Sequence, residues 1–162
     1  MFKRMLKYTF SLLFLVISCN GLAGGMPLAS DLQQTYTSEG FNNKGQSKVA
    51  LILVSQPNCN YCDLITEEIL QPMLLNGSYE QTTLFLEVET NSGKQLVDFS
   101  GKNVPATKFA QRYNAWATPT LLFLDQQGNE IAKKMVGINT IELYGFYVDK
   151  ALKSAFKAIN PD

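Results

Sequence analysis

Two cysteines, Cys59 and Cys62, enclose the dipeptide Asn60-Tyr61 in the stretch "SQPNCNYCDLITEEIL", residues 55–70. A pair with this spacing can act as a redox couple, as half of a zinc site, or as a structural crosslink. Zinc needs four ligands, and the chain has no histidine and only three cysteines, which disfavours a metal site. A structural disulfide would close a very short loop and stabilise the fold little. We therefore favour the redox couple and expect no metal.

The cysteine pair is placed where a strand should end and a helix should begin. Residues 49–54 are all apolar, which predicts a strand buried on both faces of a sheet. Apolar residues at three- and four-residue steps predict a helix from Cys59 to about residue 75, which Pro72 should kink or end. A thiol at a helix N-terminus lies among free backbone N–H groups, which favour the thiolate. Cys59 can then attack a disulfide of another protein, and Cys62, one turn along, can resolve the mixed disulfide.

The remaining chain predicts a single α/β domain. Strands are expected over 82–88, 118–125 and 130–137, helices over 28–38, 105–115 and 139–159, and a short hairpin within 90–104. Early strands alternate with helices and should pair in parallel, whereas the last two should form an antiparallel hairpin. Asn139 and Glu142 have the spacing of a capping arrangement. The core face of the last helix is expected to consist of Leu143, Phe146, Tyr147, Ala151, Leu152, Ala155 and Ile159.

The first residues have the layout of a secretory signal peptide. Lys3, Arg4 and Lys7 precede an apolar run over 10–17 that is too short to span a bilayer comfortably. Cleavage after residue 23 would leave an N-terminal extension over 24–47 and a domain over 48–160. Alternatively, "VISC" resembles a bacterial lipobox, in which a signal over 1–18 is removed and Cys19 is lipidated. An uncleaved membrane anchor is a third possibility.

Charge and residue types exclude several classes of function. The chain has 14 basic and 14 acidic residues, so nothing indicates a nucleic-acid partner. Without histidine, a Cys–His catalytic pair cannot form from this chain alone. Export would place the domain in the periplasm or cell envelope, where disulfides persist. A lipid on Cys19 would be its only link to the membrane, and we expect a monomer.

Two longer stretches resemble the thioredoxin-like superfamily. They are "ALILVSQPNCNYCDLI" (50–65) and "RYNAWATPTLLFLDQQGNEI" (112–131). The resemblance implies the thioredoxin fold, an α/β architecture with a central mixed sheet, a parallel βαβ N-terminal part, an antiparallel C-terminal hairpin and flanking helices. The chain between the two motifs is longer than in a minimal thioredoxin. In this extra length the sequence resembles exported branches such as the SoxW-like group.

The same resemblance assigns roles to residues. Cys59 matches the nucleophilic cysteine and Cys62 the resolving one, with no cofactor beyond this pair. Pro119 matches the cis-proline whose loop docks the partner peptide, and Thr118 precedes it. With Asn60 and Tyr61 these two residues form the expected substrate-binding set, and protein thiols and disulfides are the expected partners. Trp116 either stacks near the active site or packs behind the proline loop.

The sequence also departs from the family pattern. Many members have an acid six residues before the first cysteine, where this chain has Leu53. Glu87 is a candidate to replace that acid, but we expect it to face solvent. No histidine separates the cysteines, which favours a reductase or reducing isomerase, supplied by a membrane electron donor, over an oxidant. The alternative is a non-catalytic binding module with a permanent Cys59–Cys62 disulfide.

Overall fold

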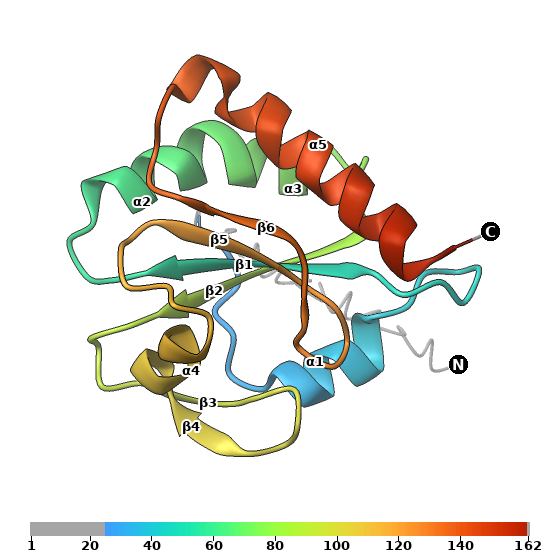
Figure 1. The fold of residues 1–162 in the computed structure, drawn as a ribbon, viewed down its shortest axis with the longest axis horizontal. Coiled ribbons are helices and arrows are strands. Elements are labelled where there is room, and N and C mark those ends of the chain that lie inside the picture. Colours follow the sequence, from blue (N-terminus) through green and yellow to red (C-terminus); the bar gives the residue numbers. More distant parts are fainter. Residues whose placement is uncertain (1–24, 162) are drawn as a thin grey trace, which may run out of the picture.

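Strand β1 (Val49–Ser55) forms the centre of the sheet because all seven of its residues are buried. In the computed structural model, which describes residues 25–161, β1 pairs in parallel with β2 (Thr83–Glu89) and antiparallel with β5 (Thr120–Leu124). Strand β6 (Glu130–Val136) pairs antiparallel with β5 and completes the order β2-β1-β5-β6 (Figure 1). This mixed sheet confirms the predicted fold class.

Helices and a small second sheet surround the four strands (Figure 1). Their bounds are α1 Leu32–Glu39, α2 Asn60–Ile65, the π-helical turn η1 Thr66–Leu70, α3 Gln71–Leu75, β3 Gln95–Val97, β4 Asn103–Pro105, α4 Ala106–Arg112 and α5 Ile141–Ile159. Strands β3 and β4 form the predicted short hairpin as a separate antiparallel pair. The predicted signal peptide, its alternative over 1–18 and Cys19 lie outside the described residues.

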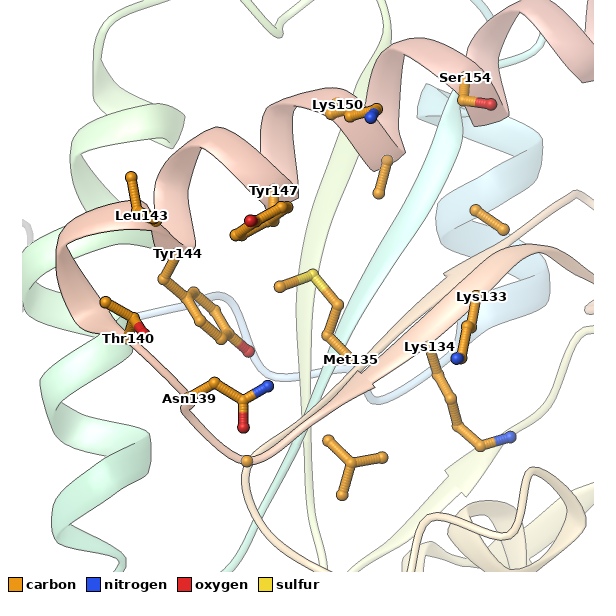
Figure 2. Close-up of a pocket in the computed structure, with 14 residues that line it drawn as sticks. Lys133, Lys134, Met135, Asn139, Thr140, Leu143, Tyr144, Tyr147, Lys150 and Ser154 are labelled. Carbon is orange, nitrogen blue, oxygen red and sulfur yellow. The ribbon is translucent and has the colours of Figure 1, made fainter.

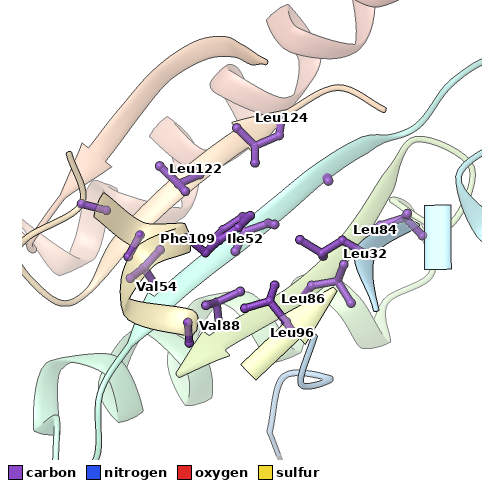
Figure 3. Packing of buried hydrophobic residues seen from close by; sticks show 14 of the residues in the cluster. Leu32, Ile52, Val54, Leu84, Leu86, Val88, Leu96, Phe109, Leu122 and Leu124 are labelled. Atoms are coloured by element: carbon purple, nitrogen blue, oxygen red, sulfur yellow. The ribbon is translucent and has the colours of Figure 1, made fainter. Parts of the chain in front are cut away.

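Two apolar cores lie on opposite faces of the sheet, because successive strand residues point to opposite sides. One face of β1, through Ile52 and Val54, packs against α1 and α4, where Leu32 and Phe109 are fully enclosed (Figure 3). The other face, which includes Leu53, packs against the segment from α2 to α3 and against α5. The strand ends that hold the cysteine pair are thus fixed from both sides.

Segment α2–η1–α3 is one helical run that changes winding before its proline. Pro72 has no N–H group and its ring clashes with the carbonyl group four residues earlier. The chain accommodates this with a π turn, in which the Gln71 N–H donates to the Thr66 carbonyl five residues back. The predicted kink at Pro72 therefore takes the form of a widened turn over η1, directly after the helical turn that bears Cys62.

Helix α5 is rotated relative to the sequence-based expectation. Its buried residues are Tyr144, Val148, Leu152 and Ala155. Leu143, Phe146 and Tyr147, predicted to be core, are instead 50%, 61% and 50% exposed. Leu152 and Ala155 are buried as predicted, and Ala151 and Ile159 pack against this core, so the predicted face is correct in the second half of the helix. It is wrong in the first half, because residues 143–148 include no charged residue and periodicity alone cannot fix which of them face the sheet. Gly145 faces Ile69 of η1 across this contact.

Two further details differ from expectation. Thr140 occupies the N-cap position of α5 and makes no side-chain capping bond, so the expected arrangement of Asn139 with Glu142 is not formed. The segment before α1 is tied to the sheet: the Ala29 N–H donates to the Glu87 carbonyl, and the Glu87 N–H donates to the Pro27 carbonyl. These bonds extend the outer edge of β2 by a short parallel bridge.

Candidate active site

Cys59 and Cys62 form a disulfide at the start of α2, with their Cα atoms 5.2 Å apart. Cys59 occupies the N-cap position, and its Sγ accepts the Cys62 N–H at 3.2 Å. The two cysteines are only 8% and 4% exposed. Asn58, directly before the pair, has a left-handed backbone with φ of 59°, which asparagine tolerates better than most residues. This turn leads directly into the start of α2, where both sulfurs are largely enclosed.

The loop before β5 brings the second motif to the first. The Thr118–Pro119 peptide bond is cis, and Thr118 Oγ1 lies 3.6 Å from Cys59 Sγ. Two hydrogen bonds hold this loop: Thr120 Oγ1 donates to the Ala117 carbonyl at 2.7 Å, and the Gly137 N–H donates to the Pro119 carbonyl at 2.8 Å. Residues 59 positions apart in the chain therefore share one site.

Aromatic side chains border the disulfide on both motifs. Tyr61, between the cysteines, is 65% exposed, and Trp116, at the start of the proline loop, is 70% exposed. Trp116 therefore does not pack behind the loop, and its stacking near the active site stays a prediction. Asn60 is also exposed, Thr118 is half-buried and Pro119 is buried. The predicted substrate-binding residues thus lie on adjoining segments around the disulfide.

Glu87 is an acid on the same face of the sheet as Leu53. Leu53 is fully buried and pairs in register with Glu87 of β2, on the face covered by α2. Glu87 is partly buried and accepts a hydrogen bond from Ser55 Oγ, so the expectation that it faces solvent is wrong. Burial raises the pKa of Glu87 above its ordinary value, and the Ser55 hydroxyl partly offsets that rise. Sequence spacing alone could not show that Glu87 pairs in register with Leu53 of the neighbouring strand.

Within residues 25–161, no cluster of three or more cysteine, aspartate or glutamate side chains has the arrangement of a metal site. In the same part of the chain, no helix combines the length and the apolar character needed to cross a membrane. The side-chain groups that the structure places in contact at the site are the two sulfurs and the Thr118 hydroxyl.

Comparison with known proteins agrees with this geometry. A family model described as "thioredoxin-like domain" matches residues 42–151. No curated protein matches the chain. Among solved structures, thioredoxin F from spinach chloroplast superposes with a TM-score of 0.51 at 11% identity, covering 81% of this chain and 94% of its own.

Two other solved structures superpose less closely. A thioredoxin-fold protein from Helicobacter pylori gives a TM-score of 0.45 at 18% identity, with 78% and 94% of the two chains covered. Thioredoxin O2 from Arabidopsis thaliana gives 0.48 at 18% identity, with 79% and 96% covered. The matched residues include both cysteines and the proline loop, and the chain belongs to the thioredoxin-like family.

Proposed function

We propose that this protein is a thiol–disulfide oxidoreductase of the bacterial cell envelope that reduces disulfides of other proteins. The observation that carries the proposal is the Cys59–Cys62 disulfide, which faces Thr118 across 3.6 Å and is bordered by exposed Tyr61 and Trp116. A crosslink that served stability alone would need neither the polar contact to Thr118 nor aromatic surface around it.

The reaction consists of two thiol–disulfide exchanges. In the reduced protein, the Cys59 thiolate attacks one sulfur of a client disulfide, and the other client sulfur leaves as a thiolate and takes up a proton. Cys62 then loses its proton and attacks Cys59, which reforms the internal disulfide and releases the second client thiolate. The client gains two electrons, which the cysteine pair loses. Cys62 releases one proton, and the second proton taken up by the client thiolates comes from solvent, because Cys59 begins as a thiolate. A dithiol donor must reduce Cys59–Cys62 before each cycle.

Cys62 needs a proton acceptor in the second exchange, because it is 4% exposed. Glu87 lies on the sheet face covered by the helix that bears Cys62, and its raised pKa makes it a better base than an ordinary carboxylate. We assign Glu87 this role. In a Glu87→Gln variant the resolving step should slow and lose its pH dependence, while the first attack by Cys59 stays unchanged. An unchanged pH profile of the resolving step would remove the assignment.

The direction of electron flow rests on the residues between the cysteines. A histidine there would stabilise the reduced thiolate and make the couple oxidising, but Asn60 and Tyr61 carry no positive charge. The signal-like first residues support export to the periplasm or cell envelope, with the mature N-terminus either free or lipidated at Cys19. An exported reductase needs a membrane protein that supplies electrons, and the proposed working unit is a monomer.

A redox titration tests both the function and its direction. The protein is equilibrated in thiol–disulfide buffers, and alkylated Cys59 and Cys62 are counted by mass. A potential near about −270 mV supports a reductase, and one near about −120 mV makes the protein an oxidant. A pair that stays oxidised below about −300 mV is a structural crosslink, and the proposed activity would then be wrong.

A further inference from the structure

A groove with a volume of about 880 Å³ separates β6 from α5. One wall is strand β6 over residues 132–137, and the other is a stripe on α5 that includes Leu143, Tyr147, Lys150 and Ser154 (Figure 2). Two elements therefore face each other across an elongated space of the size that binding sites commonly have.

The dimensions and chemistry of the strand wall suit an extended peptide. Strand β6 is the last strand of the four-stranded sheet, so in residues 25–161 its outer backbone groups have no strand partner, and such an edge is a template for a further strand. Residues 132–137 extend over about 17 Å at strand spacing, and residues 143–154 extend over about the same length at helical spacing. A strand of five or six residues would match both walls.

The charge of the groove selects an anionic occupant. Lys133, Lys134 and Lys150 line it, and no carboxylate does, although the whole chain is balanced at 14 basic and 14 acidic residues. Lys134 pairs with Glu130, and the other two lysines form no ion pair within the described part of the chain. Lys133 and Lys150 are thus exposed cations that can pair with carboxylates of a ligand bound in the groove.

Unused apolar and polar groups also point into this space. Leu143, Tyr147 and Val136 line the groove and are 50%, 50% and 51% exposed. Tyr144 projects from α5 toward β6 (Figure 2), and its hydroxyl is the single buried side-chain polar atom without a partner in residues 25–161. A buried donor without a partner is costly, and it lies at the inner wall of this groove.

The groove starts beside the active site. Gly137, its end residue, donates its N–H to the Pro119 carbonyl at 2.8 Å, and Thr118 contacts the Cys59 sulfur. A client bound at the disulfide could therefore continue along β6 without leaving the protein surface.

We propose that this β6–α5 groove binds an extended segment of a client protein in which acidic and apolar residues alternate, and that the segment adds a strand to β6. Its apolar side chains, on the face toward α5, contact Leu143 and Tyr147, and its carboxylates, which the alternation places on the opposite face, pair with Lys133 of β6. The identity of the partner as a client rests on the proposed function, whereas the peptide-binding property does not involve the cysteines.

Peptide binding is tested by fluorescence anisotropy with a labelled hexapeptide of alternating valine and glutamate. We expect it to bind, a valine–lysine version to bind at least about tenfold more weakly, and β6 amides to exchange hydrogen more slowly in the complex. Tyr147→Ser and Lys133→Glu should each weaken binding about tenfold. The matched controls Phe41→Ser, exposed in another part of the fold, and Lys157→Glu, on α5 but outside the groove, should leave it unchanged.

Two results would overturn the proposal. One is equal binding of the two peptides or unchanged hydrogen exchange in β6. The other is binding to vesicles of anionic phospholipid that is lost in Tyr147→Ser while the peptide does not bind, which would make the groove a membrane contact.

The link to clients needs a separate measurement. The KM for a disulfide-bonded protein that bears the hexapeptide should be about tenfold lower than for the same protein without it, and Tyr147→Ser should abolish the difference. Cys59→Ser should lose the redox activity and still bind the hexapeptide. This variant therefore distinguishes failure of the redox activity from failure of the groove. Equal KM values in the wild-type protein would show that the groove does not serve clients.

Discussion

The sulfur of Cys59 lies 3.6 Å from the hydroxyl oxygen of Thr118, a residue 59 positions later in the chain. The contact joins the strand-to-helix turn of the first motif to the loop of the second. Because the hydroxyl can donate to sulfur, it can stabilise negative charge on Cys59 when the disulfide opens. In the proposed reaction, the reactivity of the pair would therefore depend on both motifs together.

Replacing this hydroxyl should slow the attack of Cys59. Thr118→Val keeps the branched shape and removes the donor, and the loss of about 1 kcal/mol of hydrogen bonding corresponds to a rate of attack lowered about fivefold. Stopped-flow reduction of a small chromogenic disulfide by the reduced protein measures this rate. Thr118→Ser should restore most of it. Equal rates for Thr118→Val and the wild-type protein would show that the contact has no part in reactivity.

Trp116 should contribute to binding of protein clients but not to the chemistry. It is 70% exposed beside the proline loop, where a large aromatic side chain can anchor a partner. Trp116→Ala should raise the KM for a disulfide-bonded protein about tenfold and leave the rate with a small disulfide unchanged. Phe41→Ala is the control, since Phe41 is also exposed, at 46%, but belongs to another part of the fold. A loss of activity with both substrates would refute the binding role.

Because of Glu87, the free energy of unfolding should decrease as pH rises above the ordinary pKa of a carboxyl group. Burial raises its folded-state pKa above the unfolded value near 4.5, so the folded protein retains the proton more strongly and is favoured at lower pH. The free energy of unfolding should therefore decrease as pH rises from the unfolded pKa through the folded one. Urea unfolding between pH 4 and pH 8 measures this slope.

Two variants isolate the Glu87 contribution. Glu87→Gln should abolish the decrease of the free energy of unfolding with rising pH. Ser55→Ala should extend this decrease to higher pH, because the Ser55 hydroxyl lowers the pKa of this carboxyl group. Wild-type and Glu87→Gln proteins with parallel stability profiles would contradict this account of Glu87.

Asp98 should have the opposite dependence on pH. It is 2% exposed and accepts hydrogen bonds from Arg112, from the Ser100 N–H and hydroxyl, and from the Lys102 N–H. Burial alone would raise its pKa, but these donors hold the pKa well below its usual range. The stabilisation it provides is present at neutral pH and is lost as pH falls below the ordinary value of 3.8 toward the folded pKa.

Removal of this carboxylate should therefore be costly at neutral pH. Asp98→Ala should lower the free energy of unfolding by about 3 kcal/mol at pH 7, and the deficit should shrink as the solution is acidified. The exposed Asp63→Ala should change stability by less than about 0.5 kcal/mol. A deficit that stays constant down to pH 3 would show that the ionised form of Asp98 is not what stabilises the loop.

The sequence predicted the parts of this fold that depend on local pattern. The apolar run over 49–54 is the central strand β1, the Gln126–Asn129 turn joins an antiparallel hairpin, and Cys59 and Cys62 form a disulfide. Each of these depends on residues close in sequence, for which periodicity and turn residues are informative.

Features that depend on distant packing were not predictable in this way. The rotation of α5, which exposes Phe146 and Tyr147, is set by contacts with η1 and the sheet. The burial of Glu87 depends on Ser55 in the neighbouring strand and on the segment over 27–29. The β6–α5 groove requires both the order of the strands and the helix rotation, neither of which a periodic pattern specifies.

The central claim, that Cys59 attacks disulfides and Cys62 resolves the product, is tested most directly by trapping. Cys62→Ser is reduced and mixed with a defined disulfide-bonded protein, and the products are analysed by non-reducing electrophoresis and mass spectrometry. We expect a stable mixed disulfide through Cys59, and none with the matched Cys59→Ser variant. Absence of an adduct from Cys62→Ser, or an equal adduct through Cys62 in Cys59→Ser, would contradict the account.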